Sequence, residues 1–327
     1  MSTRDRTAEI LEIKRRNLMD HGFYSYNLIA LNKEWQKTAK DRGSAPDFYL
    51  IRAVTILEVS TRQQIAGLID HAKHFTDRAV ELSKNFKMDF ATVRDIQGRA
   101  ITLGDIVAHS VPVNAFGQIL DYFETLLGKP LRPLLAGAMD RWRTEIEKQP
   151  PEPIIPDFDA LKKRLSHLFE IRHILCHELP EKPVYSISEV ADFLEDAVRF
   201  TKAMEEVVTF EKYGLKPLTQ REMSIDALNR LRDKEKELDS FLTSLGAFLE
   251  KFGEVPANFN RIGGTWLSCL DNAQGKWLVY RNAHCDAVTY LNQGGTIRSL
   301  LWAFEAITMT ERRLAELRTW FDHELKK

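Results

Sequence analysis

The chain has 327 residues, 44% of them hydrophobic, and its 46 Lys and Arg against 47 Asp and Glu give a formal net charge of −1. This length predicts two domains, at roughly 150 residues each, with a sizeable core. The balanced charge excludes a globally basic nucleic-acid coat, and no apolar run approaches the roughly 18 residues of a transmembrane helix. The amphipathic start is unlike a secretory signal, and an odd number of cysteines (three) argues against a disulfide framework, so we expect a cytoplasmic protein.

Helix formers are abundant and Gly and Pro are scarce, which predicts an all-α fold. In the first half of the chain, apolar residues at helical spacing predict helices over about 5–40, 47–77, 78–90, 113–127 and 131–148. The proline-rich stretch 149–156 is a stiff connector. It marks either a domain boundary or a long loop inside one helical domain. We favour the loop, because the helix that follows needs an earlier partner.

The second half of the chain has clearer helix starts. Ser186 with Glu189, and Thr219 with Glu222, each fit a capping box at the beginning of a helix. A Gly- and Pro-containing break near 215 predicts the main boundary, which gives a helical domain over 1–214 and a smaller one over 215–327. The expected helices span about 157–178, 186–211, 219–252, 263–288, 296–306 and 309–325.

Residues 169–178 carry the side chains most suited to chemistry. His173 and His177 lie one helical turn apart on a shared face, whereas Arg172 and His177 are separated by roughly 140° about the helix axis, so both can border a groove. A histidine can transfer a proton near neutral pH, and a guanidinium can hold two phosphate oxygens. These residue types therefore suit phosphodiester cleavage.

Two plainer interpretations of this segment remain open. The cationic side chains could cap carbonyl groups at a helix end. Alternatively, His173, Cys176 and His177 could bind zinc, although no second ligand pair lies nearby and the His-Glu-x-x-His motif is absent. We expect Cys176 to be a small buried residue.

The signature of HEPN domains is an Arg and a His separated by four residues, the first of which is polar. The segment that resembles it here is Arg172-His173-Ile174-Leu175-Cys176-His177. An apolar helix leads into it, and a short polar loop and a long amphipathic helix follow. The upstream run 50–70, with Glu58 in an apolar setting, resembles the early helix that packs against the motif helix. The resemblance covers about residues 45–210.

This resemblance implies an all-helical bundle that forms a homodimer with two motifs across a shared cleft. It further implies metal-independent cleavage of RNA to 2′,3′-cyclic phosphate and 5′-hydroxyl ends, without a cofactor, by a toxin or an antiviral, abortive-infection effector. His177 would be the general base or acid, Arg172 would stabilise the charged transition state and His173 would orient the motif or substrate. Glu58 is a lesser candidate, for orienting Arg172 or His177. Some HEPN-like domains are non-catalytic, so a dimerisation or binding bundle is the alternative.

In the last third, an aromatic-rich segment falls on a predicted helix. Trp277, Tyr280, Arg281 and Cys285 recur there at spacings of three and four residues, which predicts an amphipathic helix that buries Trp277 and Cys285. Farther on, we expect Thr310 to cap the final helix. We expect Arg313 to pair with Glu316 or Glu305.

These residues resemble the lysozyme-inhibitor LprI-like family over about 220–325. The family pattern is Trp-x-x-Tyr-Arg, a Cys four residues after the Arg, a Gly-Gly loop and then Thr-x-x-Arg-x-x-x-Leu. Secreted members carry several disulfide cysteines, whereas residues 215–268 here have none and Glu305 stands where a cysteine is usual. We therefore expect an intracellular module that binds a protein partner or trigger, with free thiols at Cys269 and Cys285, in preference to a secreted lysozyme inhibitor. The matching positions are Trp277, Tyr280, Arg281, Cys285, Gly294, Gly295, Thr310, Arg313 and Leu317.

Overall fold

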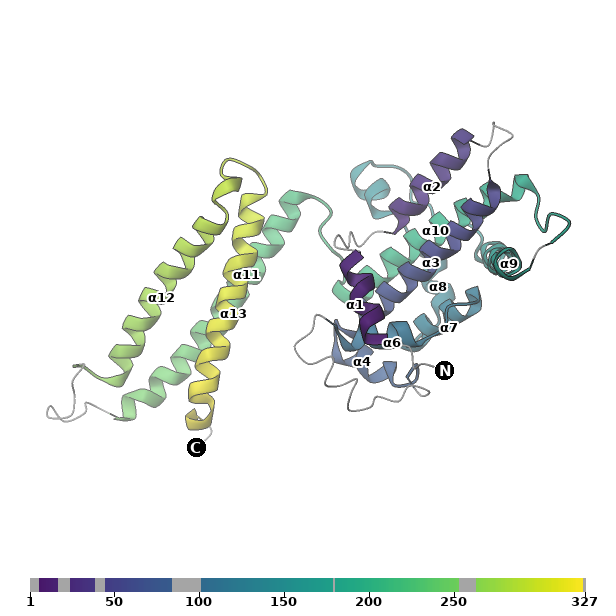
Figure 1. Ribbon diagram of the computed structural model, residues 1–327. Coiled ribbons are helices and arrows are strands. Elements are labelled where there is room, and N and C mark those ends of the chain that lie inside the picture. Colours follow the sequence, from purple (N-terminus) through teal and green to yellow (C-terminus); the bar gives the residue numbers. More distant parts are fainter. Residues whose placement is uncertain are drawn as a thin grey trace. The chain divides into compact units, whose positions relative to one another are not determined.

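A computed structural model describes residues 6–16, 24–38, 45–83, 101–178, 180–252 and 263–325 (Figure 1). These residues form helices joined by turns and loops, and they contain no strand beyond an isolated bridge between Met139 and Pro153. The prediction of an all-α fold is therefore confirmed. The chain divides into two compact units, Met1–Leu215 and Lys216–Lys327. Among the described residues, none of the helices combines the length and apolar character needed to cross a bilayer.

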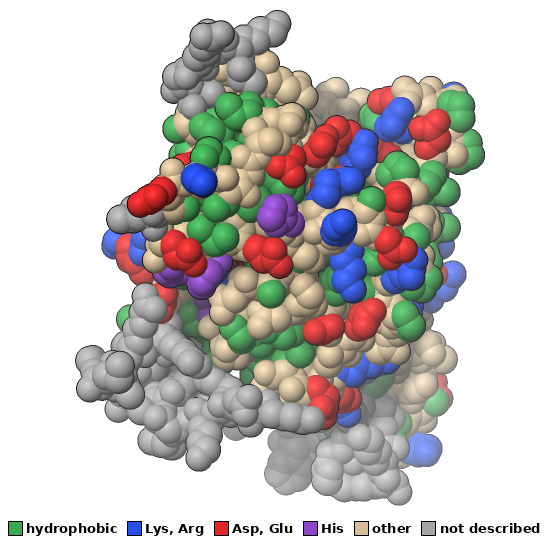
Figure 2. Space-filling model, turned by 90° about the vertical axis from the view of Figure 1, so that its right-hand side faces the viewer, with side chains coloured by type: hydrophobic (Ala, Val, Ile, Leu, Met, Phe, Trp, Pro, Cys, Tyr) green, Lys and Arg blue, Asp and Glu red, His purple; other side chains and the backbone are tan. Residues whose placement is uncertain are grey.

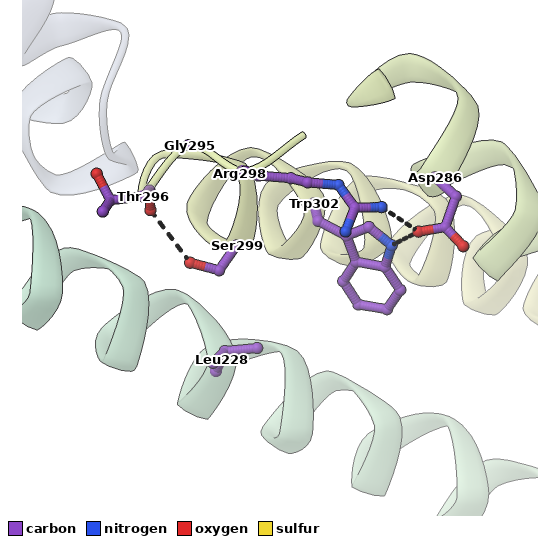
Figure 3. Close-up of a pocket in the computed structure, with 8 residues that line it drawn as sticks. Leu228, Asp286, Gly295, Thr296, Arg298, Ser299 and Trp302 are labelled. Carbon is purple, nitrogen blue, oxygen red and sulfur yellow. Dashed lines mark hydrogen bonds and ion pairs between the residues drawn. The ribbon is translucent and has the colours of Figure 1, made fainter. Parts of the chain in front are cut away.

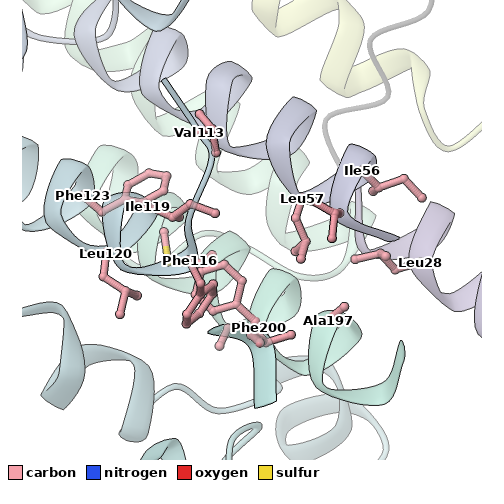
Figure 4. Packing of buried hydrophobic residues seen from close by; sticks show 14 of the residues in the cluster. Leu28, Ile56, Leu57, Val113, Phe116, Ile119, Leu120, Phe123, Ala197 and Phe200 are labelled. Atoms are coloured by element: carbon pink, nitrogen blue, oxygen red, sulfur yellow. The ribbon is translucent and has the colours of Figure 1, made fainter. Parts of the chain in front are cut away.

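The N-terminal unit is built around one apolar helix, α3 (Pro46–Ile69), which begins with a proline at its first turn and buries residues on most of its circumference. Figure 4 shows the core beside it, where Leu28, Leu57 and Phe116 from three different helices meet. Around α3 pack α2 (Ser25–Thr38), α4 (Lys73–Ala79), α6 (Leu103–Ser110), α7 (Phe116–Leu127), α9 (Phe158–His177) and α10 (Ile187–Tyr213). The remaining helices of this unit are α1 (Arg6–Arg16), α8 (Leu131–Ala136) and the π-helix η1 (Trp142–Ile146).

Helix α9, which carries the HEPN-like motif, is held by polar contacts in its N-terminal half. Asp157 caps its N-terminus by accepting a hydrogen bond from the Ala160 amide, at 3.0 Å. Asp196 on α10 is buried, and its carboxylate accepts two hydrogen bonds from the Arg164 guanidinium of α9, at 2.5 and 3.1 Å. A bidentate pair of this kind fixes orientation as well as distance. The motif at the end of α9 is therefore held on a rigid helix.

Several predicted helices of the N-terminal unit have different bounds. The helix predicted over 47–77 ends at Ile69, and the chain passes through the extended residue Ala72 before it restarts at α4. Just beyond α3, the Asp70 carboxylate accepts a hydrogen bond from the Gly104 amide, at 2.9 Å. Gly104 lies so close that a β-carbon on it would be 2.4 Å from the Ala66 oxygen. Helix α6 was not predicted from the sequence, although Thr102 and Asp105 form a capping box at its start.

Three further bounds of that unit differ from the prediction. The helix predicted over 5–40 is described as α1 and α2, with Tyr24 in a turn and residues 17–23 outside the described part. In the helix predicted over 78–90, the described residues, 78–83, form the end of α4 and a turn. Residues 84–90 lie outside the described part. The helix predicted over 131–148 is broken into α8 and η1, since the chain leaves the helix at Gly137.

The C-terminal unit consists of three long helices, with α11 and α13 packed most extensively. The helices predicted over 296–306 and 309–325 are one helix, α13, and the expectation that Thr310 caps it is wrong. Thr310 is buried inside the helix and donates a hydrogen bond to the Ala306 carbonyl, at 2.7 Å. The three helices are α11 (Gln220–Leu249), α12 (Trp266–Val288) and α13 (Arg298–Leu325), with 3₁₀ turns η2 (Glu250–Phe252) and η3 (Tyr290–Asn292).

A buried arginine joins these three helices. The Arg281 side chain on α12 is 4% exposed, and its Nη2 lies 2.8 Å from Oε1 of Glu235 on α11. Its Nη1 donates to the Thr310 hydroxyl of α13, at 3.1 Å, and its guanidinium lies 5.5 Å from the centre of the Trp277 ring. Cys285 is fully buried beside it, as predicted, whereas Trp277 is half-buried. The Arg281 guanidinium thus links α12 to α11 and α13 through polar contacts.

We expect Arg281→Met to lower the free energy of unfolding of the C-terminal unit by about 2–3 kcal/mol, because the variant loses charged hydrogen bonds to two neighbouring helices. Urea unfolding of the full chain, followed by tryptophan fluorescence, reports on this unit, since four of the six tryptophans lie in it. Arg312→Met, at an exposed position of α13, is the control. Equal unfolding midpoints for the two variants would contradict the structural role of Arg281.

Candidate functional site

The structure brings Arg172 and Glu58 together at the contact between α9 and α3. Nη2 of Arg172 lies 3.3 Å from Oε1 of Glu58, and the two side chains are 27% and 13% exposed. Burial raises the pKa of the Glu58 carboxyl, and the nearby guanidinium of Arg172, followed by that of Arg62, partly offsets the shift. The sequence left open whether Glu58 would orient Arg172 or His177, and in the described residues its ion pair is with Arg172.

Two residues that the sequence analysis did not single out extend this group. Nη1 of Arg62, one turn beyond Glu58 on α3, lies 3.9 Å from Oε2 of Glu58. The pKa of His109 on α6 is lowered, first by burial and then by the charge of Arg62. The spacing of four residues between Glu58 and Arg62 was a readable signal for an ion pair on one helix face. His109 offered no such signal, because its helix was not predicted.

The two motif histidines form a separate group. The His173 and His177 rings lie with their centres 4.9 Å apart, and both side chains are exposed near the end of α9. Among the described residues, neither ring forms a hydrogen bond or ion pair with Arg172 or Glu58. One chain therefore presents a guanidinium and a pair of imidazoles at different angles about the same helix.

The alternative interpretations of the motif segment fare differently. Cys176 is exposed, so the expectation of a buried residue is wrong. In the described part of the chain, no group of three or more His, Cys, Asp and Glu side chains is arranged to hold a metal ion. The Arg172 side chain turns toward α3, and its Nε is buried without a hydrogen-bond partner among the described residues.

The charge on the surface is mixed. Figure 2 shows Lys and Arg side chains interspersed with Asp and Glu over one face, with histidines among them. The formal net charge of −1 agrees with this distribution. Any attraction of this protein for a polyanion therefore has to come from local groups of cations and not from the field of the whole molecule.

The C-terminal unit has a pocket of about 670 Å³ between the start of α13 and its neighbours (Figure 3). Nη2 of Arg298 lies 2.7 Å from Oδ1 of Asp286, and the Trp302 indole donates a hydrogen bond to the same oxygen, at 3.1 Å. The charges of the lining side chains cancel, which leaves a neutral pocket with one aromatic wall. Its lining residues are Leu228, Asp286, Gly294, Gly295, Thr296, Arg298, Ser299 and Trp302.

Comparison with known families assigns the C-terminal unit. The family model described as "Lysozyme inhibitor LprI" matches residues 216–317. This segment is an LprI domain. Nothing identifies a HEPN domain in the N-terminal part, and neither the curated proteins nor the solved structures gave a match to the chain.

The residues that carry the LprI resemblance serve mainly to hold the domain together. Arg281, Cys285 and Thr310 are buried between the helices, and Arg313 donates to Gln274 on α12, at 3.2 Å. Arg313 also forms an ion pair with Glu316, at 3.3 Å, which is one of the two partners predicted for it. The other alternative, Glu305, lies 3.2 Å from Nε2 of His284 instead. The three cysteines are free thiols, as expected for Cys269 and Cys285.

We expect Glu58→Gln to become more stable relative to the wild type as the pH rises from about 4 to 7. Because folding raises the pKa of Glu58, the folded state holds this proton more tightly than the unfolded state does. Ionisation of Glu58 above its folded pKa therefore lowers the free energy of unfolding, and glutamine escapes this loss. Urea unfolding at several pH values measures the difference, with the exposed Glu34→Gln variant as reference. If the difference in free energy of unfolding between Glu58→Gln and the wild type stays constant with pH, or changes in the opposite direction, then burial does not raise the pKa of Glu58.

Proposed function

We propose that the N-terminal unit is a HEPN-type, metal-independent endoribonuclease that acts in the cytoplasm as a toxin or antiviral, abortive-infection effector. The observation that carries the proposal is the position of Arg172. The first residue of the motif is held half-buried against Glu58 of α3, at 3.3 Å, while His173 and His177 stay exposed at the end of the same helix. A restrained guanidinium and accessible imidazoles on one helix are groups that suit phosphodiester cleavage.

In the proposed reaction, His177 takes the proton from a ribose 2′-hydroxyl. The oxygen attacks the adjacent phosphorus, and Arg172 stabilises the additional negative charge that develops on the phosphate oxygens. The bond from phosphorus to the 5′-oxygen then breaks, and a second imidazole donates a proton to that leaving oxygen. The products are a 2′,3′-cyclic phosphate and a 5′-hydroxyl end. His173 orients the motif or the substrate, and Glu58 positions Arg172.

A homodimer fits this assignment of roles. The reaction needs one imidazole that accepts a proton and another that donates one, whereas the two histidines of one chain lie against each other, with ring centres 4.9 Å apart. A second copy of the chain across a shared cleft would supply the other imidazole. In this proposal the LprI domain, with its neutral pocket, receives a protein partner or trigger that controls the nuclease.

The alternative is a non-catalytic HEPN-like bundle that dimerises and binds, with the LprI domain capturing a protein partner. The mixed charge of the surface in Figure 2 favours it, because sequence-independent RNA binding normally uses a basic surface. Measurement of RNA cleavage separates the two functions.

We expect purified wild-type protein to cleave RNA in the presence of EDTA and to leave 2′,3′-cyclic phosphate ends. His177→Ala and Arg172→Gln should each lower the cleavage rate by about 10²–10³, because each removes a group that acts in the transition state. Electrophoresis of labelled RNA, with phosphatase and kinase treatment of the products, gives both the rate and the end chemistry.

His74→Ala, which changes a histidine of α4 outside the motif, is the matched control for His177→Ala. Cleavage by both motif variants at the wild-type rate would refute the site. Absence of cleavage by every variant and by the wild type, with and without extracts of phage-infected cells as a source of trigger, would favour the binding protein.

A further inference from the structure

Glu58 is shared between two arginines from different helices. Its Oε1 lies 3.3 Å from Nη2 of Arg172 on α9, and its Oε2 lies 3.9 Å from Nη1 of Arg62 on α3. The carboxylate is 13% exposed, whereas the Arg62 and Arg172 side chains are 28% and 27% exposed. The acid thus lies deepest, and a guanidinium lies on either side of it, closer to solvent.

This arrangement leaves a net positive charge with unused donors. Two guanidinium groups outnumber one carboxylate, and burial favours the neutral form of that carboxyl because it raises its pKa. Each guanidinium has five N–H donors. In each arginine, a single nitrogen forms the contact with Glu58.

The groups around Arg62 do not cancel this charge. His109 on α6 has a pKa lowered by burial and by Arg62 itself, with Lys14 adding to the effect and Asp105 and Glu9 opposing it. Of the two acids, Asp105 already forms an ion pair with Lys14 of α1 and also caps α6. Within the described residues, the ion pair of Arg62 is the one with Glu58, at 3.9 Å, which Arg62 shares with Arg172.

We infer that Arg62 is a second phosphate-binding residue of the RNA site, so that one guanidinium from α3 and one from α9 hold the same stretch of RNA backbone. The inference rests on the proposed function, because it takes RNA as the ligand. Glu58 acts as the positioning residue that sets both arginines at once. Planar guanidinium groups held in place bind phosphate oxygens as forks, which a mobile surface lysine does not. Local cations of this kind suit a protein whose net charge is −1.

The test measures binding separately from cleavage. A fluorescent single-stranded oligonucleotide with 2′-O-methyl groups lacks the attacking hydroxyl, so it binds without being cut. We expect Arg62→Gln in the full-length chain to weaken its binding about tenfold and to flatten the slope of log K against log salt by about 0.7, the value for one phosphate contact on a single strand. Arg62→Lys should restore most of the slope. Arg52→Gln, at an exposed position of the same helix, should leave both quantities unchanged.

The outcomes separate the inference from the proposed function. Wild-type protein that neither binds the oligonucleotide nor cleaves RNA would overturn both. Wild-type binding or cleavage, together with an Arg62→Gln variant of unchanged salt slope, would overturn the role of Arg62 alone. Thermal unfolding by circular dichroism checks that the variant is folded. If Arg62→Gln unfolds, then the decision rests on Arg62→Met, which also removes the charge: a flattened slope supports the inference, and the wild-type slope refutes it.

Discussion

The N-terminal unit depends on how its central helix accommodates one acid. Helix α3 is apolar around most of its circumference, yet it carries Glu58 toward the interior, where loss of hydration disfavours the charged carboxylate. Arg172 offsets part of this penalty, at 3.3 Å, and in doing so fixes the end of α9 against α3. The interaction that makes the buried acid tolerable therefore also sets the position of the HEPN-like motif. Removal of Glu58 would leave Arg172 without this counter-charge, and removal of Arg172 would leave Glu58 with the more distant Arg62 alone, so the motif and the packing of the bundle are coupled.

The C-terminal unit uses an arginine in the opposite way. Arg281 is buried, and its guanidinium is engaged by Glu235, Thr310 and the Trp277 ring, from three helices. Little of its hydrogen-bonding capacity is left for a ligand, so its role is to hold the domain together. Arg172 is more exposed and keeps a donor without a partner. The same residue type thus stabilises one unit and serves as a candidate binding group in the other, and the difference lies in how many of its donors the protein itself occupies.

The local signals in the sequence predicted helix starts better than helix ends. Ser186 and Thr219 begin α10 and α11 because their side chains complete capping boxes, a property of four consecutive residues. Beyond the end of α3 at Ile69, the chain turns at the extended Ala72, and Asp70 contacts Gly104, thirty-four residues away. No local pattern encodes that contact. Thr310 was misread for the related reason that a threonine suits both a cap and the interior of a buried helix. The motif Arg172–His177 was readable from spacing, whereas Arg62 and His109 join it only through the packing of α3 and α6.

The separation of the motif residues has a consequence for catalysis. About 140° of helix lies between Arg172 and His177, so a regular α9 directs them to different faces. In the folded chain Arg172 turns toward α3, and the two histidines turn toward each other. A substrate held by the arginines of one chain would therefore meet imidazoles most directly from outside that chain. In the proposed nuclease, a second copy of the chain would bring a further imidazole to that substrate, which is why the proposal includes a homodimer.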